Sequence, residues 1–200
     1  MSVVVHEVSH GLAAYYFGDE TARSQGRLTF NPIKHLDLFG SIILPALLIL
    51  SNAGFVLGWA KPVPYNSRNL NNQKYGPSIV VAAGIFANFF LAIVFGLLIR
   101  FAPVLGLATS SCDVTNPFIY ISSLIVVVNL LLGVFNLLPI PPLDGSQLLF
   151  QALPYRFRVV REFLESYSVF ILFFFIIFLW DYIIPIIGFL FKVIVGTICV

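Results

Sequence analysis

Apolar segments alternate with shorter polar segments along the chain, and this alternation predicts where its helices lie. Residues 78–101 and 117–138 are apolar almost without interruption, and each exceeds the roughly 20 residues that cross a bilayer as a helix. Residues 2–17 form a shorter apolar stretch that ends at Gly18, a residue typical of helix C-termini. We therefore expect helices over these three segments.

Two further apolar segments are interrupted by residues that bend or end helices. They are 39–60 and 166–192. The interrupting residues are Pro45, Asn52 and Gly54 in the first segment and Asp181 and Pro185 in the second. The first segment is either a re-entrant hairpin or one plain span, and the second is either a long broken span or a hairpin.

The distribution of Lys and Arg orients these segments. Three Lys or Arg residues occur in each of the polar segments 19–38, 61–76 and 154–165, whereas 102–116 contains none. The positive-inside rule places the first three in the cytoplasm and the last one outside. Segment 39–60 then begins and ends on the cytoplasmic side, which favours the re-entrant hairpin over the plain span.

The composition changes the class of protein that these helices imply. Hydrophobic residues make up 59% of the chain, charged residues make up 10%, and the mean hydropathy is +0.97. A soluble domain carries about 25% charged residues. The sequence therefore predicts an all-α polytopic membrane protein with about 4–6 transmembrane or re-entrant helices. A net charge of +2 without a basic stripe argues against a nucleic-acid partner.

Two smaller features complete this outline. Residues 27–30 alternate in a strand-like pattern before Asn31-Pro32, which predicts a short strand or hairpin at the cytoplasmic face. Cys112 and Cys199 fit neither a disulfide framework nor a metal cluster.

The chemistry-bearing residues begin in the first helix. Residues 6–10 read His-Glu-Val-Ser-His, so His6 and His10 lie four apart on one helix face and can bind one metal ion. Zn²⁺ is the usual ion, and Glu7 would be the general base that takes a proton from a metal-bound water. A structural hydrogen-bonded cluster is the alternative, but three such residues in an apolar helix are costly in lipid.

A catalytic zinc ion needs a third protein ligand, and the sequence offers two candidates. His35 lies among polar, surface-like neighbours. Asp144 lies between a proline-rich stretch that stiffens the backbone and Gly145, which permits a sharp turn. The topology above brings the end of span 117–138 to the side where the two histidines lie, so Asp144 is favoured, although an ordinary Asp-Gly turn explains the dipeptide alone.

Residues 136–145 read Asn-Leu-Leu-Pro-Ile-Pro-Pro-Leu-Asp-Gly, which resembles the N-x-x-P-x-x-x-x-D-G motif of the site-2 protease family of intramembrane zinc metalloproteases. Residues 6–10 match that family's H-E-x-x-H motif, and 58–64 and 83–88 resemble segments of its small bacterial members. The resemblance covers most of residues 1–153, taken as the protease core, and leaves 154–200 as a C-terminal cytoplasmic segment and membrane helix or hairpin.

The resemblance implies that His6, His10 and Asp144 bind one zinc ion and that Glu7 is the catalytic base. It implies that Asn136 holds the substrate or the oxyanion, whereas the residues alone suggest an interhelical hydrogen bond, given Asn129 on the same face. The expected activity is cleavage of transmembrane-helix proteins in a bacterial plasma membrane, with the active site toward the cytoplasm.

This chain differs from larger relatives in that it has no stretch long enough for a PDZ or CBS domain. It also lacks the helix that usually precedes the H-E-x-x-H helix, and the sequence leaves open whether that helix lies upstream of residue 1. A metal-binding transporter and an inactive scaffold that binds membrane helices are the alternative functions. A transporter needs a polar path through the bilayer, and the spans offer only Ser122 and Ser123 in their outer halves.

Overall fold

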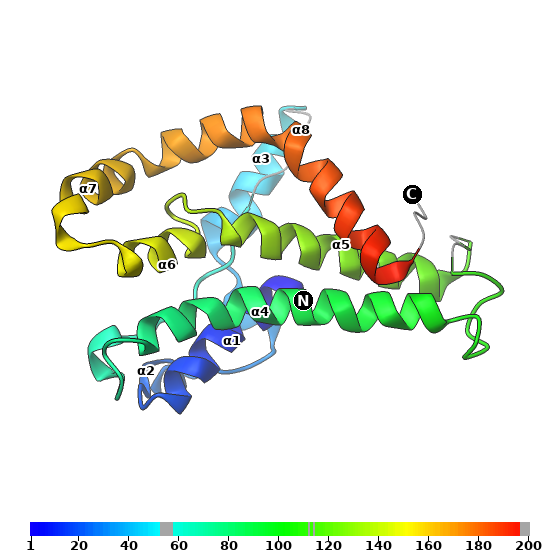
Figure 1. Cartoon of the computed structure of the whole chain (residues 1–200), viewed down its shortest axis with the longest axis horizontal. Coiled ribbons are helices and arrows are strands. Elements are labelled where there is room, and N and C mark those ends of the chain that lie inside the picture. Colours follow the sequence, from blue (N-terminus) through cyan, green and yellow to red (C-terminus); the bar gives the residue numbers. More distant parts are fainter. Residues whose placement is uncertain (53–57, 112, 114, 197–200) are drawn as a thin grey trace. The chain divides into compact units, whose positions relative to one another are not determined.

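The computed structural model describes residues 1–52, 58–111, 113 and 115–196, and it contains helices and loops with no strand among those residues (Figure 1). The chain forms two compact units, residues 1–84 and the residues from 85 onward, and the boundary falls inside helix α4 (Gly76–Phe101). The all-helical class expected from the sequence is confirmed.

The first unit contains the histidine motif on its first helix. Its elements are α1 (Ser2–Tyr16), α2 (Thr21–Ser24), a 3-10 turn (Pro32–His35), a π-helical turn (Leu38–Ile43), α3 (Leu44–Leu50), a 3-10 turn (Ser67–Asn69) and the start of α4. Helix α1 ends where expected, because Gly18 adopts a φ of 96° that other residues rarely adopt. A small core of Ala14, Leu70 and Val80 packs α1 against α4 and the loop before it.

Asp19 ties the polar segments to the end of α1. Its buried carboxylate accepts hydrogen bonds from the backbone N–H of Asn66 at 2.6 Å, from the Asn69 side chain at 3.0 Å and from Thr21. Burial raises the pKa of the Asp19 carboxyl, but these hydrogen bonds outweigh it and hold the pKa below its usual value. The charged carboxylate therefore fixes residues 66–69 beside α1.

The two ends of segment 39–60 are joined by hydrogen bonds between described residues. The Trp59 N–H donates to the Gly40 carbonyl at 3.2 Å, and the Ser41 hydroxyl donates to the Trp59 carbonyl at 2.7 Å. A Cβ on Gly40 would lie 2.3 Å from the Trp59 ring, so only glycine allows this approach. A plain span would separate its two ends by about 30 Å. The hairpin is therefore favoured by the contacts at its base, and Gly54 lies outside the described residues.

The second unit is built on the remainder of α4 and on α5 (Pro117–Leu137), α6 (Asp144–Ala152), a 3-10 turn (Tyr155–Phe157), α7 (Arg158–Ser166) and α8 (Ser168–Val195). Asn116 caps α5 by accepting the Phe118 N–H, and Pro117 occupies the first helical turn, as is common there. In Figure 1, α4 and α5 run side by side.

The core of this unit is shared by three helices. Ile99, Leu130 and Ile183 are among its fully buried residues, and they come from α4, α5 and α8. Small residues allow the helices to approach: a Cβ on Gly96 would lie 2.4 Å from the Ile194 side chain. Segment 166–192, expected as either a long broken span or a hairpin, lies in a single helix from Ser168 that continues through Pro185.

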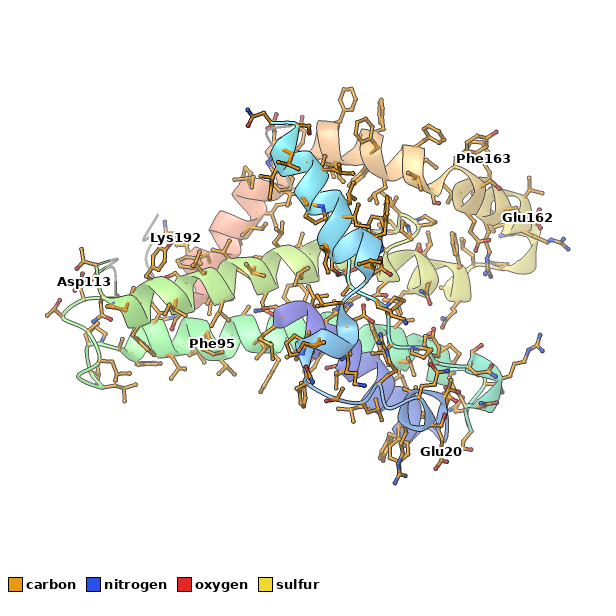
Figure 2. All side chains as sticks on the ribbon, turned by 180° about the vertical axis from the view of Figure 1, so that it is seen from behind. Glu20, Phe95, Asp113, Glu162, Phe163 and Lys192 are labelled. Carbon is orange, nitrogen blue, oxygen red and sulfur yellow. The ribbon has the colours of Figure 1, made fainter. Side chains whose placement is uncertain are left out.

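Three helices in the described residues are long and apolar enough to cross a membrane, namely Gly76–Phe101, Pro117–Leu137 and Phe178–Val195. Figure 2 shows Asp113, in the loop between α4 and α5, at one end of the second unit and Glu162 and Phe163, on α7, at the other end. Asp113 of the arginine-free loop and Glu162 of the arginine-rich segment 154–165 thus lie at opposite ends of this unit.

One sequence-based prediction is wrong in the described residues, since 27–30 forms no strand. A strand needs a partner for its backbone groups, and here the Thr29 carbonyl accepts a side-chain hydrogen bond from His35 instead. Cys112 and Cys199 lie outside the described residues.

Candidate metal centre

His6 and His10 lie together on one face of α1. Both are buried, with 5% and 8% of their surfaces exposed. Their Nε2 atoms are 3.0 Å apart, and their rings meet edge to face at a centroid distance of 4.5 Å. Two buried imidazole nitrogens at this distance must share either a proton or a cation, because their lone pairs repel each other.

The start of α4 fixes the orientation of the His10 ring. Nδ1 of His10 lies 2.8 Å from the Val80 carbonyl, which can only accept, so Nδ1 carries the proton and Nε2 of a neutral His10 keeps its lone pair. A Cβ on Gly84, one turn further along α4, would lie 2.4 Å from Cε1 of His10 and 2.8 Å from Cε1 of His6. The glycine therefore leaves room for both rings.

Glu7 is held beside the two histidines by a backbone group. Its Oε2 accepts a hydrogen bond of 2.9 Å from the Val63 N–H, and the side chain is half-buried. This bond fixes one carboxylate oxygen. Sequence reasoning missed Val63 and Val80 as partners of the motif, although Val63 lies within residues 58–64, which resemble a family segment.

The donor set of the first unit fits a zinc ion. Zinc binds imidazole nitrogen at about 2.0–2.1 Å in tetrahedral geometry, which places two such nitrogens roughly 3.3 Å apart. The observed 3.0 Å between the two Nε2 atoms is close to this value. A backbone carbonyl on the far nitrogen of His10 is also the usual partner of a metal-binding histidine.

Asp144 is the first residue of α6 in the second unit, where it is half-buried with a buried Oδ2. The following Gly145 is needed for close packing, since its Cβ would lie 2.4 Å from the backbone carbonyl oxygens of Leu137 and Leu138. The φ of Gly145 is not positive, so this glycine does not provide the sharp turn that the sequence suggested. That Asp144 reaches the two histidines stays a prediction.

Two other sequence-based candidates are also placed. His35 is not surface-like, because it is 1% exposed and its Nε2 lies 2.8 Å from the Thr29 carbonyl. Asn136 is half-buried, and its Nδ2 donates to the Leu132 carbonyl of its own helix at 3.0 Å. The interhelical bond is formed elsewhere, between the buried Asn88 and Asn129 at 2.9 Å. A substrate role for Asn136 remains untested.

Comparison with known proteins agrees with the motifs. The sequence model of peptidase family M50 matches residues 100–179. A Bacillus subtilis (strain 168) protein named "Putative zinc metalloprotease YwhC" is 38% identical over 188 residues, covering 92% of this chain and 78% of that protein. A Mycolicibacterium smegmatis (strain ATCC 700084 / mc(2)155) protein named "Putative zinc metalloprotease Rip2" is 33% identical over 147 residues, covering 72% of this chain and 51% of that protein. No solved structure matches the chain significantly. The length and identity of the first match show that this chain belongs to peptidase family M50.

Proposed function

We propose that this protein is a zinc-dependent intramembrane endopeptidase that hydrolyses peptide bonds in or near the transmembrane helices of its substrates. The observation that carries the proposal is the buried pair His6 and His10 with Glu7 beside it on one helix. Membership of a peptidase family and three apolar helices of spanning length support the same activity.

Three side chains would hold one zinc ion per chain. His6 and His10 supply their Nε2 atoms, and Asp144 is proposed as the third ligand from its place in the second motif. When bound, zinc polarises the scissile carbonyl and lowers the pKa of a bound water toward about 7. The Val80 carbonyl keeps His10 in the tautomer whose Nε2 can serve as a ligand.

Glu7 would move the proton in this reaction. The Val63 N–H occupies its Oε2, so Oε1 is the oxygen left to accept a proton from the attacking water and later to pass it to the leaving amine. The group that holds the Glu7 carboxylate directly is a neutral backbone donor, which needs no compensating charge of its own in an apolar environment.

The substrate must present an unwound segment, since a helix keeps its carbonyls in internal hydrogen bonds. We propose that the site opens toward the cytoplasm of a bacterial plasma membrane, and that water reaches it through the polar segments near 19–38 and 139–145. The arrangement of charge supports this orientation, since the arginine-rich segment and the arginine-free loop lie at opposite ends of the second unit (Figure 2).

The test compares the full chain with its Glu7→Gln variant, in detergent and with a model transmembrane peptide as substrate. Glutamine keeps an oxygen that can accept the Val63 N–H but cannot take a proton. We expect unchanged zinc content and a loss of cleavage by about 10²- to 10⁴-fold, the usual contribution of a general base.

Glu20→Gln is the matched control, because Glu20 is an acid in the neighbouring polar segment with a side chain that is 72% exposed. This variant should cleave as the parent does. Full activity of Glu7→Gln would remove Glu7 as the base. A folded parent protein that takes up no zinc would refute the metalloprotease assignment.

A further inference from the structure

One peptide group joins Glu7 to a buried arginine. The N–H of the Pro62–Val63 peptide donates to Oε2 of Glu7 at 2.9 Å, and the C=O of that same peptide accepts a hydrogen bond from Nη2 of Arg27 at 3.1 Å. The peptide thus lies between a guanidinium and a carboxylate. A donor on its oxygen polarises the peptide and strengthens its N–H as a donor.

We propose that Arg27 is a positioning residue for Glu7 and acts through the Pro62–Val63 peptide. Its meaning for catalysis rests on the proposed function, in which Glu7 is the base. The arrangement itself lies entirely within the first unit.

The other contacts of Arg27 show that it holds a whole segment in place. Nη2 also donates to the Lys61 carbonyl at 2.8 Å, and Nη1 donates to the Lys34 carbonyl. The Lys61 N–H in turn donates to the His35 carbonyl at 2.8 Å. Arg27 is only 8% exposed, and both of its Nη atoms donate to protein carbonyls, whereas its buried Nε has no hydrogen-bond partner among the described residues. Residues 61 and 62 are therefore fixed through consecutive carbonyls.

The same segment rests directly on α1. A Cβ on Gly11 would lie 2.5 Å from Cδ2 of Leu28 and 2.7 Å from Cγ1 of Val63. Gly11 is four residues after Glu7 and lies on the same helix face. Leu28 follows Arg27 and Val63 follows the residues that Arg27 holds, and both reach α1 one turn from the base. The position of the Val63 N–H is therefore sensitive to Arg27.

A lysine can replace these contacts only in part. The guanidinium is planar and donates to the carbonyls of Lys34, Lys61 and Pro62 at once. An ammonium is a compact group on a flexible stem. Arg27→Lys keeps the charge and loses the fork, and Arg27→Gln loses both. The two variants therefore form a graded series.

The experiment measures amide hydrogen exchange and catalysis on the full chain. In Arg27→Gln, we expect exchange at Val63 to rise about tenfold or more, while exchange in α5 stays unchanged. With the transmembrane peptide, kcat should fall about 10- to 100-fold with KM and zinc content retained, because a small misplacement of a catalytic group costs this much. Arg27→Lys should recover part of both effects.

Arg23→Gln is the control, because Arg23 lies in the same polar segment with a side chain that is 60% exposed. It should change neither measurement. Unchanged exchange at Val63 in Arg27→Gln would overturn the proposal. So would a kcat loss that follows loss of zinc or a rise of exchange throughout the protein, since either marks a merely structural role. If the parent cleaves nothing, the proposed function fails, and the catalytic role of Arg27 fails with it. Hydrogen exchange at Val63 still decides in that case whether Arg27 holds the N–H that binds Glu7.

Discussion

Gly84→Ala tests whether the two histidines form the metal site. The new Cβ would lie 2.4 Å from Cε1 and 2.5 Å from Nε2 of His10, and 2.8 Å from Cε1 of His6. Carbon atoms in contact lie about 3.5–4.0 Å apart, so the His10 ring must retreat by about 1 Å. Zinc–ligand distances tolerate only about 0.2 Å. Both rings are buried, and the Val80 carbonyl restrains the His10 ring.

We expect zinc to bind about 10- to 100-fold more weakly to Gly84→Ala, the loss typical when the groups that orient metal ligands are disturbed. At free zinc 100 times the parent Kd, bound zinc stabilises the parent by about 2.7 kcal/mol. A tenfold weaker variant would gain only about 1.4 kcal/mol under the same conditions. Chelator competition and thermal unfolding with and without zinc, both on the full chain in detergent, measure this difference.

Two other helical glycines provide controls. A Cβ on Gly188 meets nothing within 4 Å, so Gly188→Ala should leave zinc binding unchanged. Gly96→Ala places a Cβ 2.4 Å from the Ile194 side chain and should lower stability without weakening zinc binding. Zinc binding by Gly84→Ala as tight as by the parent would refute the reasoning, because it would mean that the rings near Gly84 do not hold the metal.

Two further predictions concern stability. Asp19→Asn should lower the free energy of unfolding by about 1–3 kcal/mol at pH 7, since it removes charge-assisted hydrogen bonds. Because the folded-state pKa of Asp19 is lowered, this difference should be fully present above the unfolded pKa of about 3.9 and be lost as pH falls through the folded pKa. Denaturation at a series of pH values from 7 into the acid range would follow this loss, and a difference that stays constant would contradict it. The second prediction is a double-mutant cycle with Asn88→Ala and Asn129→Ala. The free energies of unfolding should give a coupling of about 0.6 kcal/mol, the average for such hydrogen bonds in membranes. A coupling of zero would mean that the 2.9 Å bond adds no stability.

The sequence predicted those parts of the fold that depend on short stretches of chain. Apolar runs gave the bounds of α4 and α5 to within two residues, because a spanning helix needs a long uninterrupted run and local caps end it. Gly18 marked the end of α1 for the same local reason. The pairing of His6 with His10 also follows from spacing alone, since residues four apart share a helix face.

Long-range partners could not be predicted in this way. Nothing in the residue types of Val63 and Val80 reveals that their backbone N–H and C=O hold Glu7 and His10, because every residue but proline carries the same two groups. His35 looked exposed because its sequence neighbours are polar, yet its ring is buried beside the Thr29 carbonyl. The strand expected at 27–30 failed because alternation describes a strand's faces but does not supply its partner.

The histidines and the base in the first unit are held mainly by backbone groups, and this suits the intramembrane site proposed above. A charged partner for His10 or Glu7 would itself need compensation in lipid, whereas the Val80 carbonyl and the Val63 N–H add no charge. The compensating cation, Arg27, is placed one peptide group away from Glu7, where carbonyls bind it. The motif residues are thus oriented by main-chain geometry, and their arrangement depends on how residues 61–63 and the start of α4 pack against α1. Substitutions in residues 61–63 or at the start of α4 should therefore alter catalysis while the motif residues themselves stay unchanged.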